Sequence, residues 1–136
     1  IIQVDISPSA SDSDIRNLAQ SVISNEKLIG IFCVNEGIVN GILSATTDGT
    51  ELDRETGKYK DLLIAGFDAG RTLKNAVRNR WFYGAVAQNP YDIGYQAVVS
   101  AVKASRGEEI EDIDAEAKWY NFENMDDEEI ARLLYD

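Results

Sequence analysis

Short apolar runs alternate with amphipathic segments along this chain, and this alternation limits the folds that it can adopt. Apolar runs occupy residues 28–34, 62–67 and 83–87, and each is followed by a stretch with apolar residues at helical spacing. Short continuous apolar runs are typical of strands that are covered on both faces. The pattern therefore predicts a mostly parallel sheet with helices on both faces, an α/β fold of the Rossmann-like or flavodoxin-like class.

The predicted elements follow one another as strand and helix through the chain. We expect strands at residues 1–6, 28–34, 62–67, 83–87 and 117–122. We expect helices at residues 11–24, 36–47, 72–80, 90–105 and 126–134. In the fourth helix, the residues expected to face inward are Ile93, Ala97, Val98, Ala101 and Val102. Together the elements predict an incomplete lobe at residues 1–122 and a C-terminal tail with a short helix at 123–136.

The charge of the chain argues against a nucleic-acid partner. Its 136 residues, enough for one domain, include 24 acidic and 13 basic side chains, which gives a formal net charge of −11. An acidic surface repels phosphate backbones. The acidic stretches at 108–116 and 126–129 are expected to be solvated surfaces. No apolar run approaches the roughly 20 residues that a membrane-spanning helix needs.

The residue types that are missing exclude several chemistries. The chain has no His and one Cys, so it offers no His-dependent triad, no His metal site, no intrachain disulfide and no Cys-rich zinc site. Cys33 lies within an apolar run, where a free Cys usually behaves as a small buried hydrophobe. The segment 66–70 does not match the glycine fingerprint of dinucleotide-binding enzymes. We therefore expect a protein that is not an enzyme and has no catalytic residue, metal or cofactor.

Three polar residues follow the three buried strands. They are Asn35, Asp68 and Gln88, and in an open α/β sheet ligands bind just outside the carboxyl ends of the strands. An amide, a carboxylate and a second amide suit the hydroxyl groups of a sugar, each of which both donates and accepts a hydrogen bond. We expect these residues to line a binding crevice for a polyhydroxylated ligand.

Each of the three also has a purely structural interpretation. Asn35 can be the N-cap of the helix that follows it, and Asp68 can cap the helix after Gly70. Gln88 can be an exposed turn residue before Pro90. The recurrence of a polar residue at three successive strand ends favours the ligand site over these alternatives.

An aromatic cluster precedes the last of the three strands. Trp81, Phe82 and Tyr83 are expected to pack in the core. Stacking on a sugar is the alternative role, but these residues begin the strand whereas the predicted crevice lies at its other end.

Several segments together resemble one known family. The stretches IGIFCVNE at 29–36, IAGFD at 64–68 and VAQNPYDIG at 86–94 resemble the C-terminal half of type I periplasmic sugar-binding proteins, the ribose- and galactose-binding family of ABC importers. The family's strand ending in Asn-Asp corresponds to Asn35 and Glu36, with Glu in place of Asp. The resemblance extends over residues 1 to 122 and implies that Asn35, Asp68 and Gln88 hydrogen-bond a monosaccharide.

The resemblance also implies partners that this segment does not contain. Proteins of this family have two lobes and roughly twice this length, so the N-terminal lobe and the opening strand and helix of this lobe are expected to be missing. In the flavodoxin-like order, the missing strand would lie between residues 1–6 and 28–34. Because its absence leaves two unpaired edges, the fragment is expected to dimerise, exchange segments or rearrange.

The function implied by the resemblance is sugar import. The chain would be the C-terminal part of an extracytoplasmic, periplasmic or lipid-anchored component that binds a monosaccharide between two lobes and delivers it to a membrane permease. The alternative is the effector-binding domain of a lactose-repressor-family regulator, which shares the fold. Segment 79–84 lacks the Pro-Pro-Leu-Thr-Thr-like sequence usual in those regulators, which favours the importer.

Overall fold

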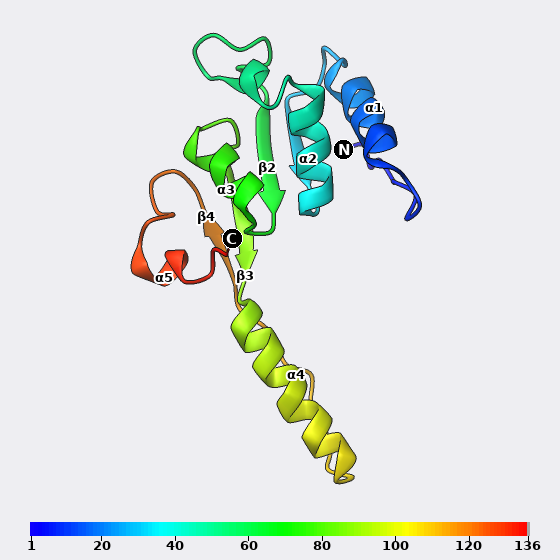
Figure 1. The fold of residues 1–136 in the computed structure, drawn as a ribbon, viewed down its shortest axis with the longest axis vertical. Helices are drawn as coiled ribbons and strands as arrows, with labels where there is room; N and C mark the ends of the chain where they lie inside the picture. The colour runs from blue at the N-terminus through cyan, green and yellow to red at the C-terminus, as the bar shows by residue number, and fades with distance from the viewer. Residues whose placement is uncertain (136) are drawn as a thin grey trace.

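The computed structural model describes residues 1–135, and a four-stranded sheet forms its centre (Figure 1). The strands are β1 (Gly30–Cys33), β2 (Leu63–Phe67), β3 (Gly84–Gln88) and β4 (Ala117–Tyr120), in the order β1-β2-β3-β4. The first three are parallel, and β4 runs antiparallel to β3. This arrangement confirms the expected α/β class with a mostly parallel sheet.

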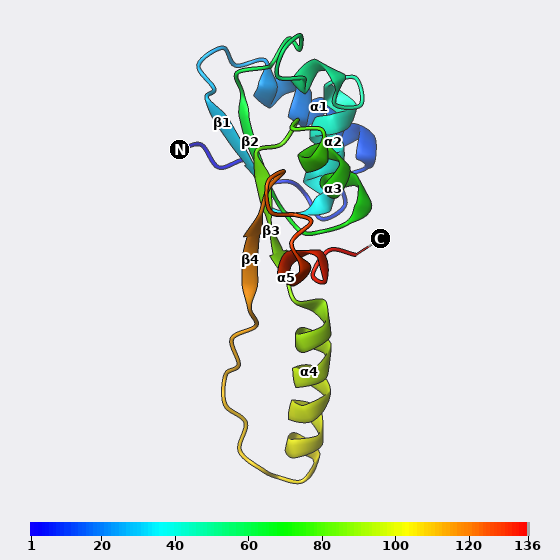
Figure 2. The ribbon, with the colours of Figure 1, turned by 90° about the vertical axis from the view of Figure 1, so that its left-hand side faces the viewer.

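Three helices cover one face of the sheet. They are α1 (Asp12–Ile23), α2 (Glu36–Ala45) and α3 (Arg71–Arg78), and Figure 2 shows them on the same side, together with α5 (Glu128–Ala131). The core lies between these helices and the sheet; its large members include Val39, Leu52, Ile64, Leu73, Val77, Phe82 and Tyr120. Sheet residues such as Phe32 and Leu63, each 55% exposed, lie outside this core, so the described residues cover one face and not the expected two.

The expected strand at residues 1–6 does not form. The segment belongs to no strand of the described structure, and Ile1, Ile2 and Val4 are exposed. Its alternating pattern fits a strand, but a strand also needs a neighbour for its backbone hydrogen bonds. Strand β1 lies at the edge of the sheet, so its outer side has no strand neighbour among residues 1–135.

Close contact between α1 and α2 depends on a glycine. Ser11 caps α1 in a capping box with Asp14, which fixes where the helix begins. A Cβ at Gly41 of α2 would lie 2.5 Å from Cγ2 of Ile15, so a side chain at this position would push the two helices apart. The loop after α2 contains the short 3-10 helix η1 (Thr50–Leu52).

Helix α4 (Pro90–Ser105) projects away from the sheet (Figure 1). None of its residues is buried, so the expected inward packing of Ile93, Ala97, Val98, Ala101 and Val102 is wrong for this chain. The helix continues outward from the end of β3 and does not turn back across the sheet. The segment after Gly107 runs back along α4 to β4 (Figure 2). The outgoing and returning segments meet where they join the sheet, and there Asn89 N donates to Glu116 O at 3.2 Å.

The C-terminal tail returns to the core. It contributes Met125, Ile130 and Leu133, which are buried, and it includes α5 within the helix expected at 126–134. Residue 136, the last of the predicted tail, lies outside the described residues. Within residues 1–135, no helix combines the length and apolarity needed to cross a membrane.

Candidate functional site

The three candidate residues lie along one edge of the sheet, at the ends of β1, β2 and β3. The register pairs Cys33 with Gly66 and Phe67 with Val86. Asn35 and Asp68 are therefore in step, two positions beyond a paired residue, and Gln88 is one position further along β3. We call the side of the sheet that carries Asn35, Asp68 and Gln88 the strand-end edge. Helix α4 leaves the sheet from this edge (Figure 1).

Asn35 is the N-cap of α2. Its Oδ1 accepts a hydrogen bond from the Ile38 backbone N–H at 3.0 Å, which confirms the capping interpretation. The residue is exposed, and among the described residues no hydrogen bond involves its Nδ2. The capping bond fixes the orientation of the amide, and its NH₂ group is available to donate to a ligand.

Asp68 occupies a strained backbone conformation. Its φ is 126°, in a region that residues with a side chain rarely adopt, and its backbone N–H donates to Val86 O at 2.9 Å. The N-cap of α3 is Gly70, which makes no side-chain capping bond, so the interpretation of Asp68 as a helix cap is wrong. Strained residues of this kind cluster at ligand sites, where the surrounding structure holds them.

Gln88 is the last residue of β3, paired with Ala117 of β4, and it is not a turn residue. Its side chain is exposed at the point where the chain leaves the sheet. The neighbouring Asn89 caps α4, since its Oδ1 accepts from Asp92 N at 3.1 Å, and Pro90 takes the first helical position. Within residues 1–135, no hydrogen bond involves the side-chain amide of Gln88.

Glu36 links the ends of β1 and β2. A Cβ built on Gly70 would lie 2.1 Å from Oε2 of Glu36, so the carboxylate rests against the glycine that begins α3. A negative charge is favourable at a helix N-terminus. The Glu36 carboxylate thus lies at the N-terminus of α3, and a side chain at position 70 would require the flexible end of Glu36 to move.

Two tyrosines that sequence reasoning did not single out contact Asp68. The Tyr120 hydroxyl donates to the Asp68 backbone carbonyl at 3.1 Å, and the Tyr135 hydroxyl donates to the Asp68 carboxylate. Burial, and then the charges of Asp68 and Glu36, raise the pKa of Tyr120. No local sequence signal marks these contacts, because they join residues 52 and 67 positions apart.

Cys33 and the aromatic cluster have structural roles. Cys33 is 0% exposed, and burial raises the pKa of its thiol to about 12, which confirms it as an inert core residue. Phe82 is buried and Trp81 half-buried, as expected of core residues, but Tyr83 is 66% exposed, so its expected packing in the core is wrong. Within the described part of the chain, no group of three or more acidic, His or Cys residues could hold a metal ion.

A sequence comparison identifies the family. The family described as "periplasmic binding protein domain" matches this chain over residues 1–109. The chain belongs to the periplasmic binding protein family. This confirms the resemblance drawn from the segments at 29–36, 64–68 and 86–94, each of which contains one of the three candidates Asn35, Asp68 and Gln88. Among curated proteins, no sequence matches this chain.

Solved structures of the family share the fold and extend beyond this chain. One from Brachyspira murdochii, described as an ABC transporter, LacI family transcriptional regulator, is 37% identical with a TM-score of 0.79; the match covers 93% of this chain and 41% of that one. A solute-binding protein from Agrobacterium vitis with bound D-fucose is 24% identical with a TM-score of 0.76, over 96% of this chain and 44% of that one.

A second solute-binding protein from Agrobacterium vitis, bound to α-D-tagatopyranose, has a TM-score of 0.80 at 21% identity, over 99% of this chain and 43% of that one. At this identity the similarity concerns the fold alone. The chain therefore spans less than half the length of each of these structures.

Proposed function

We propose that this chain is the C-terminal lobe of the substrate-binding component of an ABC sugar importer, and that its strand-end edge forms one wall of a monosaccharide site. The observation that carries the proposal is Asp68, held at a φ of 126° at the end of β2, in step with Asn35. A strained backbone at the end of a strand is costly to maintain, and recognition of a ligand by the Asp68 carboxylate gives a reason for it.

The chemistry of the edge suits a neutral polyhydroxylated ligand. The Asp68 carboxylate accepts hydrogen bonds, and the amides of Asn35 and Gln88 supply donors, so together they complement vicinal hydroxyl groups. The carboxylate disfavours a phosphorylated sugar by charge repulsion. The solute-binding proteins described above were solved with D-fucose and α-D-tagatopyranose, which are neutral monosaccharides.

The second wall comes, in this proposal, from an N-terminal lobe. Helix α4 leaves the strand-end edge with exposed apolar residues that include Tyr91, Val98 and Val102, and such a surface favours burial against a partner. We propose that α4 packs on that lobe, with residues 88–89 and 116–117 as crossing points about which the lobes close on the sugar.

The importer role also implies a location and a partner. A periplasmic binding protein works outside the cytoplasm, and the proposed partner is a membrane permease that receives the sugar. The alternative is the effector domain of a regulator, because one similar structure carries both descriptions in its name. Deleting the gene separates the two: loss of labelled-sugar uptake supports the importer, whereas intact uptake with altered transcription supports the regulator.

Calorimetry on the full-length protein tests the proposed site. We expect the wild type to bind at least one of D-fucose, D-tagatose, D-arabinose and D-allose. Asp68→Asn should weaken that binding roughly 10- to 150-fold, because it replaces hydrogen bonds to a charged acceptor. Asp61→Asn is the control, since Asp61 is an exposed residue before the start of β2, at the other end from the edge. Equal affinities for Asp68→Asn and wild type would contradict the proposal.

A further inference from the structure

The C-terminal tail, residues 123–135, folds back onto the strand-end edge. Tyr135 makes two hydrogen bonds there: its hydroxyl donates to the Asp68 carboxylate, and its backbone N–H donates to Ala69 O at 3.3 Å. We infer that Tyr135 is a positioning residue for the sugar site, which holds one oxygen of Asp68 so that the other is presented to the ligand. This inference rests on the proposed function.

The two oxygens of the Asp68 carboxylate have different surroundings. Oδ1 accepts from the Ala69 backbone N–H at 3.1 Å and from the Tyr135 hydroxyl. Within residues 1–135, no hydrogen bond is made to Oδ2. Rotation of a carboxylate about its last side-chain bond is only weakly restricted by intrinsic torsional preference. The donors on Oδ1 therefore fix the plane of the group and the direction of Oδ2, which reduces the ordering that a ligand must impose.

Tyr135 remains a hydrogen-bond donor over the physiological pH range. The hydrogen bond to Asp68, followed by burial and the charge of Asp68, raises the pKa of Tyr135 to about 12. A neutral phenol can donate to a carboxylate, whereas a phenolate cannot. The hydrogen bond from Tyr135 to Asp68 is thus retained at physiological pH.

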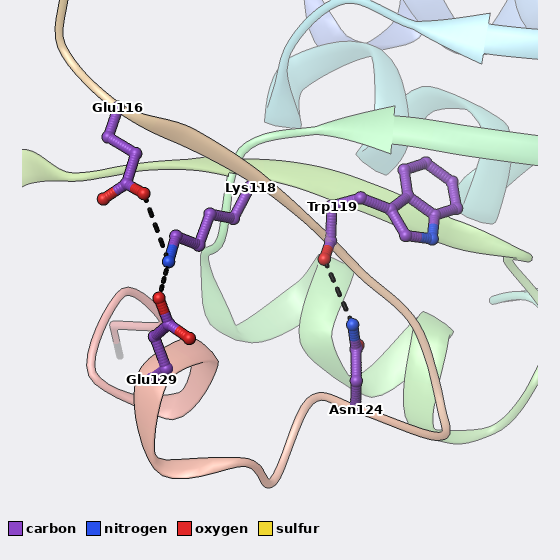
Figure 3. A network of polar contacts seen from close by, with 5 residues as sticks. All are labelled: Glu116, Lys118, Trp119, Asn124 and Glu129. Carbon is purple, nitrogen blue, oxygen red and sulfur yellow. Dashed lines mark hydrogen bonds and ion pairs between the residues drawn. The ribbon is translucent and has the colours of Figure 1, made fainter.

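The position of Tyr135 is set by the folded tail that precedes it. Figure 3 shows Lys118 of β4 between Glu116, at 3.1 Å, and Glu129 of α5. The same view shows Asn124 Nδ2 donating to Trp119 O at 3.2 Å. These contacts hold the tail against β4.

A further ion pair ties the tail to the helix that follows Asp68. Arg78 of α3 contacts both carboxylate oxygens of Asp126, at 2.7 and 3.0 Å. With Met125, Ile130 and Leu133 buried, the tail is part of the folded core. The packing of the tail therefore places the Tyr135 hydroxyl within hydrogen-bond reach of the Asp68 carboxylate.

The test is calorimetry on the full-length protein with Tyr135→Phe, which removes the hydroxyl alone. The probes are D-fucose, D-tagatose, D-arabinose and D-allose, followed by the monodeoxy analogues of whichever sugar binds. We expect Tyr135→Phe to weaken binding roughly 5- to 30-fold, which is less than the loss of a direct hydrogen bond to a charged group because Tyr135 acts on the sugar only through Asp68. The control is Tyr83→Phe at the opposite end of β3, which should change affinity by no more than about twofold.

The deoxy analogues distinguish positioning from a general loosening of the lobe. The difference between wild type and Tyr135→Phe should disappear for the one analogue that lacks the hydroxyl held by Asp68. An equal loss with every analogue, or no loss with the parent sugar, would overturn the inference and leave the proposed function intact. If the wild type binds none of the sugars, the proposed function fails, and the inference fails with it.

Hydrogen exchange on the wild type provides a second test that needs no variant. Since coupling between a ligand and the tail is reciprocal, a saturating concentration of the bound sugar should slow amide exchange at residues 130–135. Exchange in α1, on the far side of the lobe, should be unaffected. Unchanged exchange at residues 130–135 would contradict the inference.

Discussion

At the scale of single residues, Asp68 carries the most information about function. Its backbone N–H donates a hydrogen bond to Val86 O, and its backbone carbonyl accepts one from the Tyr120 hydroxyl. Its carboxylate accepts hydrogen bonds from the Ala69 backbone N–H and the Tyr135 hydroxyl. Surroundings that hold a residue this firmly can maintain a φ of 126°. The same firmness makes Asp68 suitable for orienting a ligand.

Arg54 is the residue whose side chain is most important for the loop between α2 and β2. Its guanidinium donates to the backbone carbonyls of Lys60, Leu62, Arg80 and Trp81, at 2.9 to 3.2 Å. Lys cannot reproduce a planar group with this many donors. We expect Arg54→Lys to lower the free energy of unfolding by about 2 kcal/mol in urea denaturation. Arg16→Lys, on the exposed surface of α1, is the control, and an equally small change for both would contradict this role.

Cys33 gives a prediction about reactivity and pH. Because burial raises its pKa to about 12 from 9.0, the thiol should react with an aromatic disulfide reagent only after unfolding. The unfolded thiol loses its proton first as the pH rises, so Cys33 contributes stability that is complete below pH 9 and declines between pH 9 and 12. Rapid labelling of the native protein at neutral pH would show that the site is open.

Sequence reasoning was most successful for residues whose role is local. The capping role of Asn35 and the burial of Cys33 follow from their neighbours in the chain. The positive φ of Asp68 could not be predicted, because the groups that surround it come from β3, β4 and the C-terminal tail. The contact of Tyr135 was also beyond prediction, since it depends on how a tail 67 positions away folds back.

At the scale of elements, the successes and failures have one cause. Strands β1, β2 and β3 and helices α2 and α3 were predicted, because their apolar patterns are completed by contacts within this chain. Residues 1–6 and α4 have equally clear patterns, but among the described residues the first segment pairs with no strand and no residue of α4 is buried. An apolar pattern predicts that a segment will be buried, and it does not say which chain segment will bury it.

The pairing of β3 with β4 depends on Gly84. A Cβ at this position would lie 2.3 Å from Cζ2 of Trp119 and 2.5 Å from Tyr120 O. We expect Gly84→Ala to lower the free energy of unfolding by about 1 to 3 kcal/mol, because the backbone oxygen cannot move without breaking the strand pair. Thermal denaturation would measure the change.

Gly94 of α4 offers a matched control for this substitution. No atom lies within 4 Å of a Cβ built there, and Ala is the better helix former by about 1 kcal/mol. Gly94→Ala should therefore leave stability unchanged or raise it. A loss at Gly94 as large as that at Gly84 would mean that the close approach to Trp119 is not the cause.

At the scale of the whole molecule, the described residues leave one face of the sheet and helix α4 uncovered. The chain spans 41 to 44% of the structures it resembles. The second lobe that we propose would cover these surfaces.

The proposed packing of α4 can be tested by placing a charge on it. Val98 is 65% exposed in this chain. If α4 packs on a second lobe, Val98→Asp should lower the melting temperature of the full-length protein by several degrees, roughly the effect of 1 to 3 kcal/mol. Asn75→Asp, on the exposed surface of α3, should have little effect. A melting temperature unchanged by Val98→Asp would contradict packing at this surface.

A crystal structure of the full-length protein with a bound monosaccharide tests the central claim most directly. The account predicts the sugar at the strand-end edge, with Oδ2 of Asp68 within hydrogen-bond distance of a sugar hydroxyl and the amides of Asn35 and Gln88 beside it. A sugar bound elsewhere, with Asp68 free of contact, would contradict the assignment of this edge as the binding wall.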